Sequence, residues 1–251
     1  MMAIDVAGKT ALVIGGSSGI GLALAQGFQA AGARVAIASR TPEKLEAARA
    51  RLGGGEARSY VVDATDVAEI EQLVLAVLAD FGQVDVLVNS QGTTVLKPAE
   101  EVTPAEFDLV MNTNVRSVFF ACTCFGRHML ARGKGCIINI ASLAGHRGWP
   151  QASAYAASKH GVVGLTRTFA AEWAGRGVRV NAISPGVFMT ELNRDRMAPE
   201  RKQNAMRRIP AGRFGEVGEL VSTAVFLASD GAGYVTGTVL NVDGGYLAGG
   251  I

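Results

Sequence analysis

Short apolar runs, rich in β-branched residues, alternate along this chain with stretches of helical periodicity. The seven apolar runs are Thr10–Ile14, Arg34–Ala38, Ser59–Val62, Val84–Asn89, Cys136–Ile140, Arg179–Ile183 and Val239–Val242. The helical patterns between them are Ile20–Ala31, Pro42–Leu52, Val67–Phe81, Thr103–Arg132, Ala154–Gly175 and Glu216–Ser229. Because the runs are apolar at nearly every position, both faces of the strands must be covered, as in a parallel sheet. We therefore predict one α/β domain over residues 1–251, a doubly wound seven-stranded parallel sheet with helices on both faces.

The composition excludes several classes of protein. With 251 residues, of which 49% are hydrophobic, the chain can bury a large core, which excludes disorder. The 24 basic and 22 acidic residues leave a net charge of +2, too small for a nucleic-acid-binding surface. No apolar segment reaches the roughly 18 residues of a membrane-spanning helix, and the N-terminus lacks a signal-peptide pattern. We expect a cytoplasmic protein that binds neither nucleic acid nor membrane.

The three cysteines are interpreted as small hydrophobic residues. Cys122 and Cys124 are two residues apart, which points them in different directions on a helix. No second Cys or His pair completes the ligand spacing of a zinc site, so the sequence predicts no metal centre.

One segment, residues 190–215, lacks a clear secondary-structure pattern. It contains seven basic and three acidic residues. Ligands of a doubly wound sheet bind at the carboxyl ends of its strands, and a long basic loop beside that edge suggests a mobile substrate lid. The alternative is a solvated surface loop that takes no part in binding.

A glycine-rich turn follows the first predicted strand and opens the first predicted helix. Residues 15–21 read Gly-Gly-Ser-Ser-Gly-Ile-Gly. Glycines allow a pyrophosphate to approach main-chain N–H groups closely, and the positive end of the following helix stabilises its charge. The spacing is G-x-x-x-G-x-G and therefore differs from the common dinucleotide motif G-x-G-x-x-G. We interpret the turn as a phosphate-binding loop, although a lone glycine turn is a weak signal.

The end of the second predicted strand bears on the choice of cofactor. An enzyme that uses NAD usually has a carboxylate there for the ribose 2′-hydroxyl, but this chain has Ser39 and Arg40. A guanidinium offers two parallel hydrogen bonds to a 2′-phosphate. The sequence therefore favours NADP over NAD, and the alternative is that Arg40 is an ordinary surface arginine.

Tyr155 and Lys159 form a candidate catalytic pair. They are four residues apart at the start of a helical pattern, which places both side chains on one face. An ammonium near a phenol favours the phenolate, so we expect Lys159 to lower the pKa of Tyr155. Ser142 ends an apolar strand upstream, and its hydroxyl can converge with the phenol on one carbonyl group.

Five ordered motifs resemble those of the short-chain dehydrogenase/reductase family. They are the glycine turn, Asn-Ser-Gln-Gly at 89–92, Asn114, the group Ser142, Tyr155 and Lys159, and Ser184-Pro185-Gly186 leading to Thr190. The resemblance covers nearly the whole chain and implies a Rossmann-type fold. It also implies hydride transfer between NAD(P) and a secondary alcohol or ketone. The segments 185–215 and 242–246 are similar to gluconate 5-dehydrogenase-like and other sugar-acid or polyol members.

The resemblance implies a role for each matching residue. Tyr155 is expected to be the general acid/base, Ser142 to hold the substrate oxygen, and Lys159 to bind the nicotinamide ribose. Asn114 is expected to connect Lys159 to solvent through water. The residues implied in cofactor binding are Gly15, Ser17, Ser18, Ile20, Ser39, Arg40, Asp63, Ala64, Asn89, Gly92, Tyr155, Lys159, Pro185, Gly186, Phe188 and Thr190. A homotetramer is also implied, with the helices of Asn114 and Lys159 at one interface and the C-terminal strand at another.

The chain departs from the family pattern at two places. The family usually has Thr at the position of Ile14, and Asn-Asn-Ala-Gly where this chain has Asn-Ser-Gln-Gly at 89–92. The first change removes a hydroxyl that steadies the loop, and the second puts the longer amide of Gln91 beside the cofactor. Both bear on cofactor affinity and loop rigidity, and neither alters the proton-transfer residues.

Polar and cationic residues near the expected carbonyl site favour a small polyhydroxylated or carboxylated substrate. The candidate substrate residues are Thr94, Ser142, His146, Arg147, Trp149 and Tyr155. We hypothesise a sugar acid whose carboxylate contacts Arg147 or a lid arginine; alternatively, His146 and Arg147 only shape a surface turn. Two rival functions stay open: a 3-oxoacyl-[acyl-carrier-protein] reductase, and a dinucleotide-binding module without catalysis.

Overall fold

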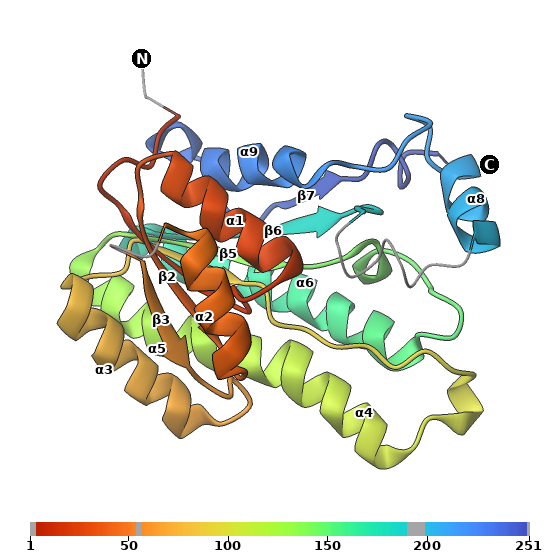
Figure 1. The fold of residues 1–251 in the computed structure, drawn as a ribbon, viewed down its shortest axis with the longest axis horizontal. Coiled ribbons are helices and arrows are strands. Elements are labelled where there is room, and N and C mark those ends of the chain that lie inside the picture. The colour runs from red at the N-terminus through yellow and green to blue at the C-terminus, as the bar shows by residue number, and fades with distance from the viewer. Residues whose placement is uncertain (1–3, 54–56, 190–198, 250–251) are drawn as a thin grey trace.

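The seven apolar runs form the seven strands of one parallel sheet in the computed structural model, which describes residues 4–53, 57–189 and 199–249 (Figure 1). The strands are β1 Thr10–Ile14, β2 Arg34–Ser39, β3 Arg58–Val61, β4 Val86–Asn89, β5 Gly135–Ile140, β6 Val178–Pro185 and β7 Val239–Val242. Their order in the sheet is β3-β2-β1-β4-β5-β6-β7. The chain crosses from the β3 edge to the centre between β3 and β4, so the direction of winding reverses between β1 and β4. The predicted fold class, a doubly wound seven-stranded parallel sheet, is confirmed, and each predicted strand lies within two residues of the observed bounds.

Helices cover both faces of the sheet, as the continuous apolar strands require. The α-helices are α1 Gly19–Ala30, α2 Pro42–Arg51, α3 Val67–Phe81, α4 Pro104–Met111, α5 Ser117–Arg132, α6 Ser153–Trp173, α8 Pro199–Arg207 and α9 Val217–Ala228. Short 3-10 turns are η1 Ala99–Glu101, η3 Leu143–Gly145, η4 Ala174–Arg176 and η5 Asp230–Ala232. One apolar cluster joins α1, α2 and α9 to the sheet, and a second joins α3, α5 and α6 to its other face. Among the described helices, none is long and apolar enough to cross a membrane.

The predicted helix Thr103–Arg132 is interrupted in the structure. A capping box between Thr103 and Glu106 starts α4, and α5 ends at Arg132 as expected. Between them, Asn112–Arg116 forms a π-helical turn, η2. Such a turn accommodates an extra residue within a helix and is frequent at functional sites. The predicted stretch is therefore helical from Pro104 to Arg132, with one extra residue accommodated in η2.

The segment predicted to lack secondary structure contains a helix. In α8, a proline occupies the first turn with Glu200, and Arg207 lies in the last turn, which suits the helix dipole. The helix is highly polar, and its few apolar residues give no stripe long enough to predict it from the sequence. The prediction was wrong for residues 199–207. Whether residues 190–215 act as a lid stays a prediction.

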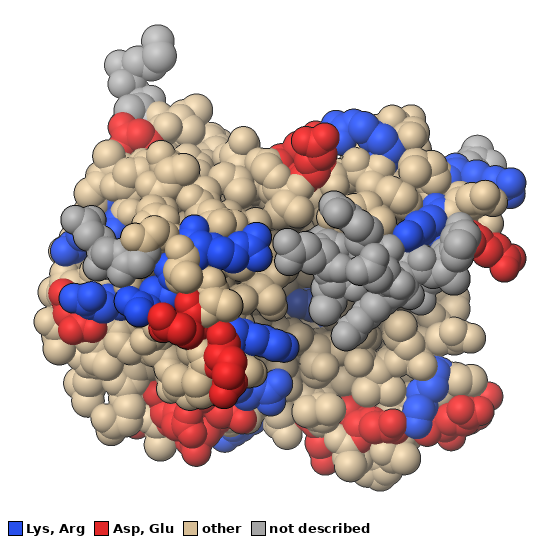
Figure 2. All heavy atoms as spheres, in the orientation of Figure 1, with Lys and Arg blue, Asp and Glu red and all other residues tan. Residues whose placement is uncertain are grey.

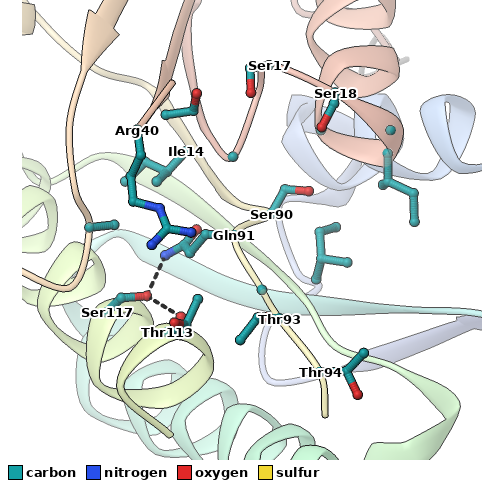
Figure 3. Close-up of a pocket in the computed structure, with 18 of the residues that line it drawn as sticks. Ile14, Ser17, Ser18, Arg40, Ser90, Gln91, Thr93, Thr94, Thr113 and Ser117 are labelled. Carbon is teal, nitrogen blue, oxygen red and sulfur yellow. Dashed lines mark hydrogen bonds between the residues drawn. The ribbon is translucent and has the colours of Figure 1, made fainter. Parts of the chain in front are cut away.

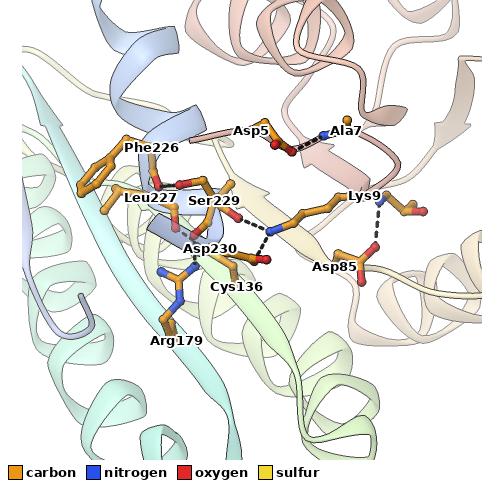
Figure 4. A network of polar contacts seen from close by, with 12 residues as sticks. Asp5, Ala7, Lys9, Asp85, Cys136, Arg179, Phe226, Leu227, Ser229 and Asp230 are labelled. Carbon is orange, nitrogen blue, oxygen red and sulfur yellow. Dashed lines mark hydrogen bonds and ion pairs between the residues drawn. The ribbon is translucent and has the colours of Figure 1, made fainter. Parts of the chain in front are cut away.

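Charged side chains at the amino ends of the strands form hydrogen bonds and ion pairs with neighbouring elements (Figure 4). Asp85, just before β4, accepts hydrogen bonds from the main-chain N–H of Thr10 at 2.9 Å and from Arg132 at 2.8 Å. Lys9 donates to the carbonyl of Ala228 at 2.9 Å and to Asp230 at 2.8 Å. These contacts join the starts of β1 and β4 to each other and to the ends of α9 and α5.

Charges on the surface are mixed. Figure 2 shows basic and acidic side chains interspersed on the face that carries α2, with acidic side chains gathered along the edge formed by α3 and α4. The three cysteines are free and buried, and burial raises the pKa of Cys122 to about 12. In the part of the chain that the structure describes, no three His, Cys, Asp or Glu side chains cluster as a metal site requires.

Candidate functional site

A cleft of about 610 Å³ lies at the carboxyl ends of the strands, where the winding reverses between β1 and β4 (Figure 3). Parallel sheets of this kind bind ligands at this edge. The predicted residues that line the cleft are Gly15, Ser17, Ser18, Ile20, Ser39, Arg40, Asp63, Ala64, Gly92, Thr94, Ser142, Tyr155, Lys159, Pro185 and Gly186. Residues separated by more than 150 positions in the sequence therefore meet at one site.

The glycine turn packs directly against the end of β4. A Cβ on Gly15 would lie 2.7 Å from the main-chain nitrogen of Gln91, and the φ of Gly15 is +80°. A Cβ on Gly21 would lie 2.2 Å from the carbonyl oxygen of Gly15. Only glycine fits either position. Ser18 precedes α1 and makes no side-chain hydrogen bond to the helix, and the residues of the first turn line the cleft, so their N–H groups are available to an anion there.

The end of β2 combines a buried hydroxyl with an exposed cation. The Ser39 hydroxyl is buried and has no hydrogen-bond partner in the structure. The Arg40 guanidinium lies over the cleft and is 4.0 Å from the Asp63 carboxylate (Figure 3). Burial alone would raise the pKa of Asp63, but hydrogen bonds from Thr65 and the charge of Arg40 lower it, so Asp63 is ionised. This end of the cleft fits a phosphate on a ribose next to the Arg40 side chain.

Unpartnered polar atoms gather in the cleft. Of the buried side-chain polar atoms without a partner among the described residues, Ser39 Oγ, Gln91 Oε1 and Thr113 Oγ1 belong to residues that line it. The Gln91 amide donates to Ser117 Oγ at 3.1 Å, and Ser117 donates to the carbonyl of Thr113 at 2.6 Å (Figure 3). A buried polar group without a partner costs about 1–3 kcal/mol, which a polar ligand relieves. The residues present therefore fit a dinucleotide.

The predicted catalytic side chains converge at the other end of the cleft. Ser142 follows β5, and its hydroxyl is hydrogen-bonded to the hydroxyl of Tyr155 in the first turn of α6. The Lys159 ammonium lies one helical turn further, 5.7 Å from the centre of the Tyr155 ring. It donates to the carbonyl oxygen of Ile140 at 2.8 Å. Lys159 is only 5% exposed, and burial lowers its pKa to about 8.

The pKa of Tyr155 shifts in the direction opposite to the one predicted. Burial raises it, and the hydrogen bond with Ser142 lowers it only in part. The Lys159 ammonium lies near the ring rather than against the phenol oxygen, and its hydrogen bond goes to Ile140. In this state of the protein, Tyr155 is therefore a protonated phenol, ready to donate.

Asn114 lies in the π-helical turn, and its side chain links two other segments of the chain. Its side-chain oxygen accepts from the N–H of Thr93 at 2.7 Å, and its amide donates to the carbonyl of Thr93 and to Ser158 Oγ, both at 2.9 Å. Ser158 in turn donates to the carbonyl of Tyr155 at 2.7 Å. Asn114 thus ties the loop after β4 to the first turn of α6, and the predicted water link to Lys159 stays a prediction.

Several predicted site residues do not reach the cleft wall. The Asn89 side chain donates to Asn139 Oδ1 at 2.9 Å inside the core, because it points along the sheet rather than out of it. Phe188 is buried and pairs with Gly215 in an isolated β-bridge. His146 contacts Ser184 Oγ at 2.8 Å. Thr190 lies outside the described residues.

The predicted substrate residues Arg147 and Trp149 pack against the C-terminal segment instead of the cleft. The Arg147 guanidinium is 5.7 Å from the centre of the Tyr246 ring, and Trp149 stacks on the same ring at 6.2 Å. Tyr246 is 6% exposed, so it draws both side chains away from the carbonyl site. Of the six candidate substrate residues, Thr94, Ser142 and Tyr155 line the cleft.

Sequence reasoning missed some lining residues, notably Lys44, Thr113 and Ser117. Lys44 is four residues after Arg40, in the first turn of α2, and this spacing was a usable signal for a second cation. Thr113 and Ser117 are also four apart in the predicted helix Thr103–Arg132. Their polarity on a helix that otherwise faces the core could have marked them as ligand contacts.

Comparison with known proteins agrees with this geometry. A family model described as enoyl-(acyl carrier protein) reductase matches residues 14–247. The D-threitol dehydrogenase of Mycolicibacterium smegmatis is 44% identical over 241 residues, which cover 95% of this chain and 93% of that protein. The galactitol 2-dehydrogenase (L-tagatose-forming) of Cereibacter sphaeroides is 45% identical over 244 residues, which cover 95% of each protein.

A solved structure is similar over the same range. The crystal structure of a gluconate 5-dehydrogenase from Burkholderia cenocepacia J2315, in complex with NADP and tartrate, matches with a TM-score of 0.92 at 37% identity. The match covers 98% of this chain and 98% of that chain. The similarity therefore includes the sheet, the cleft and the segments that surround it.

Proposed function

The chain belongs to the short-chain dehydrogenase/reductase family, and from this premise we propose NADP-dependent hydride transfer to or from a small polyol or sugar acid. The reacting group is a secondary alcohol or the corresponding ketone. The observation that carries the proposal is the convergence of the Ser142 and Tyr155 hydroxyls with the Lys159 ammonium at one end of the cleft. A carbonyl oxygen placed between the two hydroxyls meets both a hydrogen-bond donor and a proton donor.

The side chains can account for the proton in either direction. A bound nicotinamide supplies or receives the hydride. In reduction, Tyr155 donates its proton to the substrate oxygen while Ser142 donates a hydrogen bond that stabilises the developing charge there. The Lys159 ammonium, fixed by the carbonyl of Ile140, stabilises the phenolate that remains. In oxidation, the same phenolate accepts the proton of the alcohol.

The nucleotide end of the cleft supports NADP as the preferred cofactor, with NAD usable. Gly15 and the start of α1 would hold the pyrophosphate, and Asp63 with Ala64 would face the adenine. The unpartnered Ser39 hydroxyl and the Arg40 guanidinium would bind the 2′-phosphate, and Lys44 adds a second cation at the same wall. The Asp63 carboxylate lies 4.0 Å from the Arg40 guanidinium, and one oxygen of that carboxylate already accepts a hydrogen bond from Thr65.

The substrate class rests on the relatives and on the polar wall of the cleft. The matched proteins are named for D-threitol, galactitol and gluconate, two polyols and a sugar acid. Thr94 and Ser142 offer hydroxyls at the cleft wall, which suits a polyhydroxylated chain. Arg147 is held over Tyr246, so a substrate carboxylate would have to meet basic residues of the predicted lid instead.

Turnover and binding by the purified protein test the proposal. The panel contains D-threitol, galactitol, gluconate, their ketones and a 3-oxoacyl thioester, each with NADP(H) and with NAD(H). We expect turnover of a polyol or a sugar acid, and a lower Kd for NADP than for NAD. Turnover confined to the thioester would replace the proposal by a 3-oxoacyl-[acyl-carrier-protein] reductase. Nucleotide binding without turnover of any compound would favour the binding module.

The cytoplasmic location and the homotetramer expected from the sequence belong to the same proposal. Phe107, Leu109 and Phe119 are exposed by 44%, 47% and 37% on α4 and α5, where the expected interface between subunits lies. Exposed aromatic and aliphatic side chains on these two helices support association. Light scattering of the purified protein should give four times the chain mass, and fractionation of cells tests the location.

A further inference from the structure

Behind Ser142 lies a chain of hydrogen bonds that ends on a histidine. Ser184 is in β6, next to β5 in the sheet, and it is fully buried. Its hydroxyl donates to the main-chain carbonyl of Ser142 at 3.1 Å. The same hydroxyl is 2.8 Å from Nε2 of His146. The three residues are therefore linked in series, from the imidazole through one hydroxyl to the peptide group of Ser142.

The direction of these bonds follows from the number of hydrogens. A serine hydroxyl has one hydrogen, and that of Ser184 points to the carbonyl of Ser142. The imidazole nitrogen facing Ser184 must then carry the other hydrogen, so His146 is the Nε2–H tautomer. Burial lowers the pKa of His146, with Arg167 and His160 acting in the same direction against Asp243. The ring is therefore neutral and donates from Nε2.

The position of Ser142 depends on this link. Ser142 is two residues after the end of β5 and caps the 3-10 turn η3, with its side chain accepting from the N–H of Ala144 at 3.2 Å. Its carbonyl also accepts from the N–H of Gly145 at 2.9 Å. These bonds fix the turn, whereas the Ser184 bond fixes the peptide of Ser142 against the sheet. Because Ser184 is buried, water cannot readily replace that bond.

We propose that His146 and Ser184 are positioning residues, which hold Ser142 where its hydroxyl meets the substrate oxygen. The inference rests on the proposed function, in which Ser142 acts on that oxygen. His146 itself is not among the residues that line the cleft. Its effect on the reaction must pass through Ser184 and Ser142.

Two substitutions of His146 separate the hydrogen bond from the rest of the side chain. His146→Gln keeps an amide N–H that can reach the place of Nε2, whereas His146→Leu keeps bulk and removes the donor. We expect His146→Leu to lower kcat about tenfold, the equivalent of one net hydrogen bond, with the Kd for NADP within about twofold of the parent. His146→Gln should restore kcat to within about threefold, with a pH profile of the parental shape.

The same substitution in a Ser142→Ala background tests the route of the effect. If His146 acts through Ser142, His146→Leu should lower kcat no further there, because the group that it positions is gone. A full tenfold loss in that background, or parental kcat in His146→Leu itself, would overturn the inference. Tm is measured for each variant to show that the protein is folded.

A spectroscopic measurement needs no substrate. The nitrogen NMR signals of the imidazole of His146, assigned by their absence in His146→Gln, should report the Nε2–H tautomer in the parent at neutral pH. Ser184→Ala should change these signals. An Nδ1–H tautomer in the parent would contradict the chain of hydrogen bonds from His146 through Ser184 to Ser142, whether or not any tested alcohol is turned over. Absence of turnover by the parent would count against the proposed function and not against the tautomer.

Discussion

The two ends of the same parallel sheet differ in whether their polar side chains have hydrogen-bond partners. At the amino ends, Asp85 accepts hydrogen bonds from Arg132 and the N–H of Thr10, and Lys9 donates to the end of α9 and to Asp230, all at 2.8–2.9 Å. At the carboxyl ends, Ser39, Gln91 and Thr113 each leave a buried polar atom without a partner. One end therefore stabilises the fold, whereas the other holds polar groups ready for a ligand. The difference teaches that stability and activity can be changed separately in this molecule, from opposite edges of one sheet.

The largest effect is expected at the carboxyl end, on activity alone. Tyr155→Phe removes the proton donor, and general acid–base catalysis contributes about 10²–10⁴-fold, so we expect kcat to fall about a thousandfold. Stopped assays with the best substrate of the panel measure this, and the Kd for NADP should stay near the parental value. Tyr60→Phe removes a hydroxyl that is bonded to Asp80 and belongs to a residue that does not line the cleft, so it is the matched control and should keep kcat. Equal activity of both variants would contradict the role of Tyr155.

At the amino end, the expected effect is on stability alone. Asp85→Ala leaves Arg132 and the N–H of Thr10 without their shared acceptor, and breaking such a buried pair costs about 3 kcal/mol. Chemical unfolding measures this, and kcat at low temperature should be unchanged. Asp230→Ala removes an exposed ion pair with Lys9 and should cost about 0.5 kcal/mol or less. A loss of activity in folded Asp85→Ala would contradict the claim that the amino ends of the strands affect stability alone.

The pH dependence of stability should follow the same carboxylate. Burial would raise the pKa of Asp85, but hydrogen bonds from Arg132, Thr10 and Gln83 lower it below the ordinary value. A lowered pKa in the folded state means that the stabilisation is present above about pH 4 and is lost as the pH falls through the folded-state pKa. The difference in unfolding free energy between the parent and Asp85→Ala should therefore be constant near neutrality and shrink in acid. A difference that grew in acid would contradict this assignment.

A smaller effect is expected on nucleotide selectivity at the cleft. Arg40→Ala should weaken NADP binding about tenfold, since a charge-assisted hydrogen bond is worth about 1.5–3 kcal/mol and this side chain is exposed. The Kd for NAD should change little. Arg58→Ala, which removes the same charge at the amino end of β3, should leave both dissociation constants unchanged. Titration calorimetry with both nucleotides distinguishes the loss of a specific contact from the loss of general positive charge.

The smallest effect is expected at Gln151, a residue with a strained backbone just before α6. Gln151 has a φ of +61°, the sole non-glycine residue with positive φ among the described residues. Its carbonyl accepts from the N–H of Lys97 at 2.8 Å, which holds the turn before α6. Gln151→Gly should raise the unfolding free energy by about 0.5 kcal/mol, because glycine adopts this conformation without strain. Gln203→Gly in α8 is the control and should be destabilising; a loss of stability in both would exclude strain at Gln151.

The sheet and the catalytic pair could be predicted because their signals are local. Each strand shows as a continuous apolar run, and the spacing between Tyr155 and Lys159 places both on one helical face whatever surrounds them. The phosphate-binding turn is likewise a run of adjacent residues. Their places in the cleft follow once the strands are known to be parallel, since all their carboxyl ends meet at one edge.

Other parts of the site depend on contacts that no local pattern records. His146 and Ser184 are 38 residues apart and meet only because β5 and β6 are neighbours. Tyr246 draws Arg147 and Trp149 away from the carbonyl site by burying its own ring, about a hundred residues from both in the chain. The direction of the pKa shift of Tyr155 depends on how deeply the phenol is buried, whereas the sequence shows only that a cation lies nearby.

The π-helical turn at Asn112–Arg116 determines which change of length this stretch of the chain tolerates. Each residue of an ordinary helix advances the side-chain direction by about 100°, so deleting one residue within α5 itself would rotate the rest of that helix by more than a quarter turn. The π-helical turn already holds one extra residue, so a deletion there would leave an ordinary α-helix with α4 and α5 still in phase. The apolar stripe of α5 would stay on the sheet, and a one-codon deletion would remove only the local widening of the helix that carries Asn114.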